Sequence, residues 1–193
     1  MKKVIIFLCM GILFLSGCSL SQDNPKAVLT GTIDAILKQD FKSARNTTVF
    51  SSYADKFYAA YESAAGDELN QKLFDKATYE VTSEQKESDD VYTYQVKVTS
   101  PNLQKVFNDV FQQFFMANMN ENEEFKSLDE VISDYIPKAL DSDDLEMKSY
   151  DVPVKVQKEE GAWKVNVTKE LVDPLTGGMY SLIESSIELS PNE

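Results

Sequence analysis

The sequence predicts an α+β fold in which N-terminal helices precede an antiparallel sheet of about four strands. Three observations predict it. Apolar residues recur at helical spacing in the first part of the chain, and two later stretches alternate apolar with polar residues on either side of a charged turn. A pair of long amphipathic helices is inserted between those two stretches. Two hairpins make one sheet of ordinary size, and helices with a single apolar stripe bury that stripe against it.

The N-terminal helices are predicted from their apolar spacing and from capping residues. Pro25 suits the first turn of a helix that ends near Lys38, and Asp40 is a cap for a short second helix from Phe41. A third helix is expected from Phe50 to about Ala64, followed by one or two further turns. The residues that repeat at helical spacing are Val28, Leu29, Ile33, Ile36, Leu37, Phe50, Tyr53, Phe57, Tyr61, Leu69 and Leu73.

Two hairpins are predicted where the period changes from helical to alternating. The first begins at Ala77, turns through the charged run 84–90, and returns along 91–99. The second begins at Met147 and turns at 159–161, and its last strand starts at Trp163. Pro153 lies in the first strand of the second hairpin. Proline donates no backbone hydrogen bond, so we expect an edge position or a bulge there.

The inserted helical pair is expected over 102–119 and 125–140, with Pro137 in its last turn. The first of these helices carries a phenylalanine stripe, for which core packing is the favoured role; its members are Phe107, Phe111, Phe114 and Phe115. A final amphipathic helix is predicted to start at Asp173-Pro174. Its later apolar residues are Leu175, Met179, Leu182, Ile183 and Ile187.

The first residues have the pattern of a secretory signal. Lys2-Lys3 precedes an apolar run over 4–15 that is too short for a spanning helix, which needs about 20 apolar residues. Leu15-Ser16-Gly17-Cys18 follows, and it resembles the lipobox of bacterial lipoproteins. The resemblance implies a signal peptide over 1–17, a diacylglyceryl thioether (and acyl chains such as palmitate) on Cys18, and a lipidated tether over 18–24. We therefore expect a single domain over 25–193, held on the extracytoplasmic face of the cell membrane.

Composition narrows the chemistry of the mature chain. Loss of Lys2 and Lys3 leaves 17 basic and 32 acidic residues, a net charge of −15 that repels nucleic acid. Arg45 is the only arginine. The chain has no histidine, and Cys9 and Cys18 are its only cysteines, so the mature domain has neither an imidazole nor a free thiol. These absences exclude Ser-His and Cys-His nucleophile pairs, and we expect no cofactor.

Two short stretches carry a resemblance to a known family. Ile36-Leu-Lys-Gln-Asp-Phe-Lys-Ser-Ala resembles the join between the first two helices of nuclear-transport-factor-2-like (cystatin-like) domains, and Gly161-Ala-Trp-Lys-Val-Asn resembles a late strand of those domains. The resemblance implies a cone formed by a curved sheet and helices. Within that fold, the chain is similar to uncharacterised lipoproteins of Gram-positive bacteria that carry a domain of unknown function. The helical pair over 102–140 departs from the minimal fold, and the family implies no catalytic residue.

Candidate ligand-binding residues are aromatic side chains that reach a pocket between the sheet and the helices. They are Tyr79, Tyr92, Tyr94, Phe111 and Trp163. The acidic stretch 141–146 offers oxygen atoms to a hard cation, yet it lacks the length and central glycine of a calcium loop. A solvated connection is the favoured interpretation of that stretch, and we expect no metal site.

The sequence favours a non-enzymatic lipoprotein that binds an unknown ligand or partner, either a small apolar molecule or an envelope protein. Two alternatives stay open. One is a histidine-free hydrolase that uses Asp or Glu in the cone pocket, and the other is an interaction module without a small-molecule site. A filled apolar cone favours the interaction module, an open cavity favours ligand binding, and converging buried carboxylates favour the hydrolase.

Overall fold

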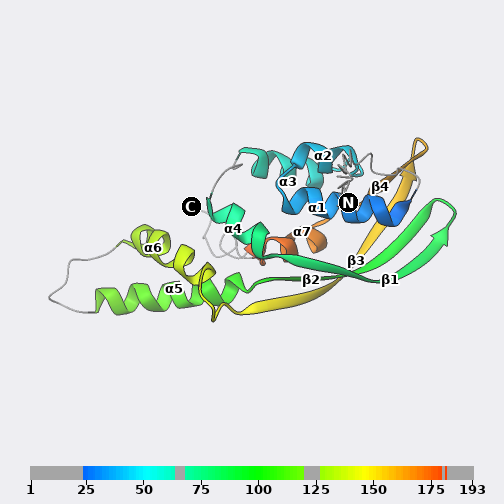
Figure 1. The fold of residues 1–193 in the computed structure, drawn as a ribbon. Helices are drawn as coiled ribbons and strands as arrows, with labels where there is room; N and C mark the ends of the chain where they lie inside the picture. Colours follow the sequence, from blue (N-terminus) through cyan, green and yellow to red (C-terminus); the bar gives the residue numbers. More distant parts are fainter. Residues whose placement is uncertain (1–23, 64–67, 120–126, 180, 182–193) are drawn as a thin grey trace, which may run out of the picture.

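The computed structural model describes residues 24–63, 68–119, 127–179 and 181. The predicted signal peptide, Cys18 and most of the predicted last helix lie outside the described residues. The elements, drawn in Figure 1, are α1 (Pro25–Leu37), α2 (Phe41–Asn46), α3 (Ser52–Ser63), α4 (Glu68–Lys76), β1 (Thr78–Ser88), β2 (Val91–Pro101), α5 (Leu103–Asn118), α6 (Leu128–Leu140), β3 (Met147–Glu159), β4 (Ala162–Val165) and α7 (Lys169–Leu175).

The four strands form one antiparallel sheet in the order β1-β2-β3-β4, as predicted. β4 pairs only with residues 156–159 of β3, so Pro153 lies on the part of β3 that β4 leaves uncovered. This confirms the edge position expected for that proline. The first hairpin differs from its prediction, because β1 continues to Ser88 and the chain reverses only at Asp89-Asp90.

Helices cover one face of the curved sheet, and Figure 1 shows α1, α2 and α3 on that side. Along β2, Tyr94, Val96 and Val98 are buried, whereas the alternate residues Gln95 and Lys97 are exposed. The valines of β3 alternate in the same way. α1 packs on β3 and β4, and α7 packs on β2 and β3. The helix-covered concave face is therefore the main core, and the opposite face is polar, as in many antiparallel sheets.

The predicted helix starts are confirmed at α1 and α2. The Asn24 side chain accepts hydrogen bonds from the backbone N–H groups of Lys26 and Ala27, and Pro25 follows it directly. The Asp40 side chain accepts from the Ser43 N–H at 3.1 Å, and hydrogen bonding to Ser43 lowers the pKa of the Asp40 carboxyl. These caps fix where α1 and α2 begin.

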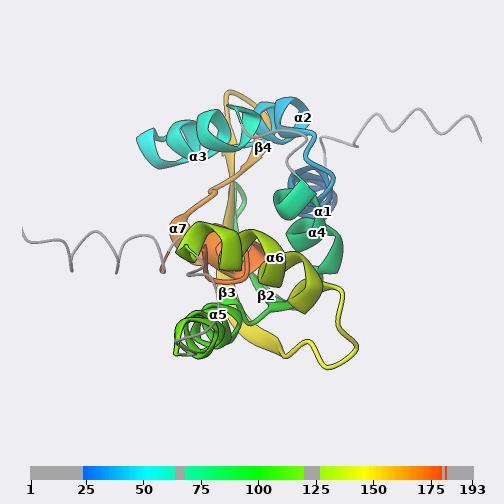
Figure 2. The ribbon, with the colours of Figure 1, turned by 90° about the vertical axis from the view of Figure 1, so that its left-hand side faces the viewer.

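A second core holds the inserted helical pair. α5 and α6 pack on each other and on Leu73 of α4. Figure 1 shows the pair projecting beyond the sheet, and Figure 2 shows α5 end-on. Ser127 and Glu130 form a capping box at the start of α6. Pro137 does not end α6, which continues to Leu140. The buried members of this core are Leu73, Leu103, Val106, Val110, Val131, Ile136 and Leu140.

The prediction of a helix start at Asp173-Pro174 is wrong. α7 begins earlier, at Lys169, and Pro174 lies in its last turn. Leu171, Val172 and Leu175 of this helix are fully buried, so packing on the sheet rather than the Asp-Pro signal places it. Leu182, Ile183 and Ile187 of the predicted helix lie outside the described residues.

Candidate binding surfaces

The strand aromatics predicted as candidates share one face of the sheet. The register pairs Tyr79 with Val98 and Tyr94 with Val154, and it places all of these on the concave face. Tyr92 and Trp163 lie on the same face toward the other end of the sheet. These four side chains therefore lie on the face of the sheet that the helices cover.

Tyr92, Tyr94 and Trp163 form one aromatic group on this face. The rings of Tyr92 and Tyr94 stack with centroids 6.2 Å apart, and Tyr92 meets Trp163 edge-on at 5.4 Å. Trp163 is only 7% exposed and Tyr94 is fully buried. The Tyr94 hydroxyl has no hydrogen-bond partner of normal length among the described residues, and burial raises the pKa of that phenol. The group packs in and against the main core.

Tyr79 fixes α1 against the sheet. Its hydroxyl donates to the Asp34 carboxylate at 2.7 Å and lies 3.2 Å from the Thr30 carbonyl, so β1 is tied to α1 by polar contacts. Burial, with the adjacent Asp34 charge, raises the pKa of the Tyr79 phenol. The Tyr79 hydroxyl therefore makes a structural contact and is not available to bind a ligand.

Phe111 lies apart from the other candidates, on the projecting helix α5. It is 47% exposed, and Phe115 is 63% exposed, so the core role expected for these two side chains is wrong. Phe107 and Phe114 are half-buried against α6. The physical reason is that α5 packs along one side only, and no described segment covers the other side.

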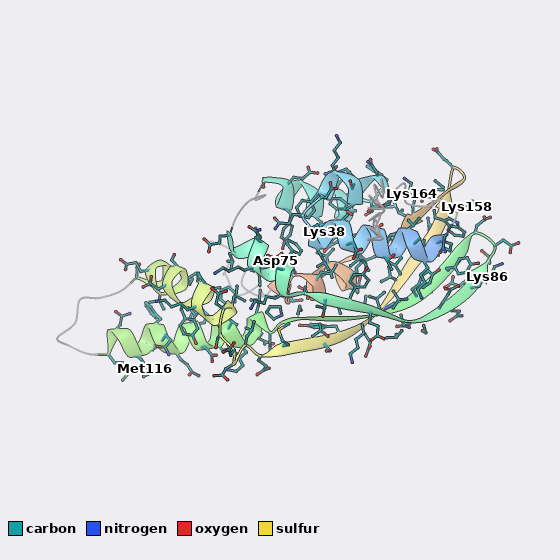
Figure 3. All side chains as sticks on the ribbon, viewed as in Figure 1. Lys38, Asp75, Lys86, Met116, Lys158 and Lys164 are labelled. Atoms are coloured by element: carbon teal, nitrogen blue, oxygen red, sulfur yellow. The ribbon has the colours of Figure 1, made fainter. Side chains whose placement is uncertain are left out.

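The outer face of α5 is the largest group of exposed apolar side chains that the described residues present. It consists of Phe111, Phe115, Met116 and Met119 at 47%, 63%, 64% and 77% exposure. Figure 3 shows Met116 at the outer side of this helix. The sequence contains no charged residue from Val110 to Asn120, although 26% of the chain is charged. We use "outer face of α5" for these four side chains.

A signal for this surface exists in the sequence. A helix that covers a core on one side needs an apolar stripe of about 100°. In α5, Val106 and Val110 fill that stripe, and Phe111 and Phe115 widen the apolar arc beyond it. The excess apolar arc, together with the missing charges, distinguishes α5 from an ordinary amphipathic helix.

The candidate aromatics line none of three surface cavities formed by described residues. The cavity of about 350 Å³ lies between α7 and the start of β3, the one of about 210 Å³ between α5 and α6, and the one of about 110 Å³ beside Arg45. The polar side chains that line the largest are Asn102, Gln104, Lys148, Tyr150, Asp173 and Ser181. All three open at the surface and differ from the apolar cone pocket expected from the sequence.

Carboxylates of the 141–146 stretch point to separate partners. Asp141 accepts from Lys72 Nζ at 2.7 Å, and this contact lowers the pKa of the Asp141 carboxyl. Glu146 accepts from the Asn102 amide at 2.6 Å. Across residues 24–63, 68–119, 127–179 and 181, no three His, Cys, Asp or Glu side chains are grouped as metal ligands would be. Asp141 and Glu146 are therefore each engaged by a partner on another element, and they do not converge on one centre.

Among the described helices, none is both long enough and apolar enough to cross a membrane.

Comparison with known proteins identifies a fold likeness only. No family model matches the chain, and no curated protein matches it. The chain is similar to an NTF-2-like protein of unknown function from Shewanella oneidensis MR-1, of which a crystal structure exists. The identity is 9%, the likeness covers 72% of this chain and 88% of that one, and the TM-score is 0.41. The α+β class stated above follows from this chain's own helices and strands.

Proposed function

We propose that this protein is a lipid-anchored, non-enzymatic binding module of the extracytoplasmic face, and that it binds a protein partner through the outer face of α5. One observation carries the proposal: Phe111, Phe115, Met116 and Met119 are exposed together on a helix segment without charge.

Such a surface has the composition of an interface centre. Charged residues are depleted there and aromatic and methionine side chains are enriched, whereas a soluble monomer exposes few contiguous apolar patches. Methionine adapts its shape to a partner because its side chain is unbranched and polarisable. Val106 and Val110 already fill the core side of α5, so the outer face adds nothing to the packing of the fold. Left open to water, this surface would lower the solubility of the protein.

The filled concave face favours a protein partner over a small apolar ligand. α1 and α7 place Leu29, Ile33, Leu171 and Leu175 on it, all at 0% exposure. The aromatic candidates on the sheet are core residues in this arrangement. Of the alternatives that the sequence leaves open, the interaction module therefore gains support.

The position of α1 supports display away from the membrane. Asn24 caps the start of α1, directly after the tether that Cys18 would anchor. In Figure 1, α1 begins at the end of the molecule near the β3–β4 turn, and α5 ends at the opposite extremity. Lys86 and Lys158 mark the first end in Figure 3, and Met116 marks the second. An anchored chain would hold the outer face of α5 at its distal end.

Site-specific photo-crosslinking in intact cells tests the proposal. The photoreactive amino acid benzoylphenylalanine replaces Phe115 in the full-length protein, and it replaces Phe50, which is 84% exposed on the α2–α3 connection, in the matched control. We expect one discrete crosslinked product from position 115, and loss of that product when Phe111→Glu is added. Equal crosslinking from both positions, or none from position 115, would contradict the proposal.

A further inference from the structure

We infer that the outer face of α5 pairs with the same face of a second copy of this chain, with the two α5 helices side by side and running in the same direction. The inference rests on the proposed function, because it names the partner of that surface. The surface is self-complementary in chemistry, since aromatic rings and methionine thioethers contact each other favourably.

Charge favours this face as the meeting point of two copies. The chain carries a formal net charge of −13, so most encounters between copies are repulsive. The segment from Val110 to Asn120 carries no charged side chain that could repel the same segment of a second copy. The charged side chains of α5, Lys105 and Asp109, lie at its base and neutralise each other at 2.8 Å. Pairing along this surface therefore brings no charged side chain of the segment 110–120 against its counterpart.

The exposed area matches what a weak dimer needs. With about 200 Å² for each full aromatic or methionine side chain, the four exposures give on the order of 500 Å² per copy. A symmetric pair then buries on the order of 1,000 Å², where specific interfaces begin. This area predicts a weak pair, and tethering to one membrane raises the effective concentration at which it forms.

The spacing of the side chains sets the direction of the helices. Phe111, Phe115 and Met119 recur every four residues and therefore form one ridge along α5. Two copies anchored in one membrane are related by a two-fold axis along the membrane normal, and α5 points away from the anchored end in both. Each ridge residue then lies across the axis from its own counterpart.

The anchoring membrane is a less suitable occupant. An apolar helix face enters a bilayer only where it lies in the plane of the interface. In Figure 1, α5 ends at the far end of the molecule from the start of α1, which Asn24 caps. Basic residues that attract anionic lipid headgroups are absent from the segment 110–120.

Disulfide trapping in native membranes tests the inference on the full-length protein. Cysteine replaces Phe111 or Met119 in separate variants, with Phe50→Cys as the control, and a mild oxidant is added. The background is clean, because Cys9 and Cys18 are the only native cysteines and both fall within the signal and its predicted lipidation site. We expect a disulfide-linked product of twice the chain mass from each α5 variant and none from Phe50→Cys. Adding Phe115→Glu should lower its yield about tenfold, because it buries an unpaired charge.

The remaining outcomes separate this inference from the proposed function. A disulfide that forms only when the Phe111→Cys and Met119→Cys chains are mixed would overturn the parallel arrangement. Failure to form any disulfide, combined with photo-crosslinking of position 115 to a different protein, would overturn pairing of this chain with itself and leave the proposed function standing. If disulfide trapping and photo-crosslinking both fail, the pairing of two copies and the proposed function are both overturned.

Discussion

The hydroxyl groups of Tyr58 and Thr48 lie 2.7 Å apart beneath α3. Thr48 Oγ1 also donates to the Ala44 carbonyl at 2.8 Å, so the Tyr58 phenol is the donor to Thr48. Tyr58 is 1% exposed and Thr48 is 8% exposed, and Thr48 bridges to Val165 of β4. This contact joins the helical layer to the last strand of the sheet.

Burial raises the pKa of the Tyr58 phenol to about 12, above its ordinary value of 10.0. Between these values the unfolded chain releases the proton while the folded chain keeps it. The stability contributed by Tyr58 is therefore complete below pH 10 and falls as the pH rises toward 12, by roughly 1 kcal/mol per pH unit. Urea unfolding at about pH 9 and about pH 11 measures the fall, which Tyr58→Phe should reduce. An equal fall in both proteins would contradict the assignment.

Gly177 is required where α7 ends against the start of α5. Its φ is +69°, and a Cβ atom there would come within 2.7 Å of the Pro101 carbonyl oxygen. Gly161 has a φ of +86° but open space around it, so it is a matched control. We expect Gly161→Ala to lower the free energy of unfolding by about 1–2 kcal/mol through backbone strain alone. Gly177→Ala should cost at least about 1 kcal/mol more, and equal midpoints in urea would refute the close approach.

Trp163 is the single tryptophan of the chain and lies in the main core. Emptying this site with Trp163→Ala should lower the free energy of unfolding by about 3–5 kcal/mol. Trp163→Phe keeps part of the ring contact with Tyr92 and should cost less. Native fluorescence of the parent protein reports the environment directly, and emission at a fully solvated wavelength would argue against this packing.

Cys18 is predicted to carry the lipid anchor. Cys18→Ala should block lipidation and leave the precursor unprocessed. Cys9→Ala changes a residue within the apolar run and should leave lipidation and processing unchanged. Detergent phase partitioning and mass spectrometry of the mature N-terminus distinguish the two variants. An unmodified mature N-terminus at another residue in the parent protein would show that the lipobox resemblance is misleading.

Elements with strong periodicity or a capping residue were predictable from the sequence. Asn102 and Pro25 mark the starts of α5 and α1, and the alternation around Trp163 places that side chain in the core. The first hairpin was harder, because backbone pairing extends β1 to Ser88 through side chains that are exposed on both faces. The end of such a strand cannot be predicted from alternating apolar residues, because it has none.

The binding surface was harder to predict than the fold. Periodicity records that Phe111 and Phe115 lie on a helix, but it does not record how many neighbours that helix has. Only the structure shows that α6 covers one side of α5 and that the other side carries the exposed apolar groups. The strand candidates were limited in a similar way. Alternation does not say which face of the sheet Tyr94 takes; the register places it on the inward face, and the packed helices fill that face.

Hydrogen–deuterium exchange of the full-length protein tests the central claim most directly. The measurement compares the protein in membranes isolated from its own cells with the separate domain from Asn24 onward, read by mass spectrometry of proteolytic fragments. If the outer face of α5 is the occupied surface, fragments covering 110–118 exchange more slowly in the membranes, and fragments of β2 and β3 exchange equally in both samples. Slower exchange confined to β2 and β3, or equal exchange of α5 in both samples, would contradict the claim that this helix is where the protein binds.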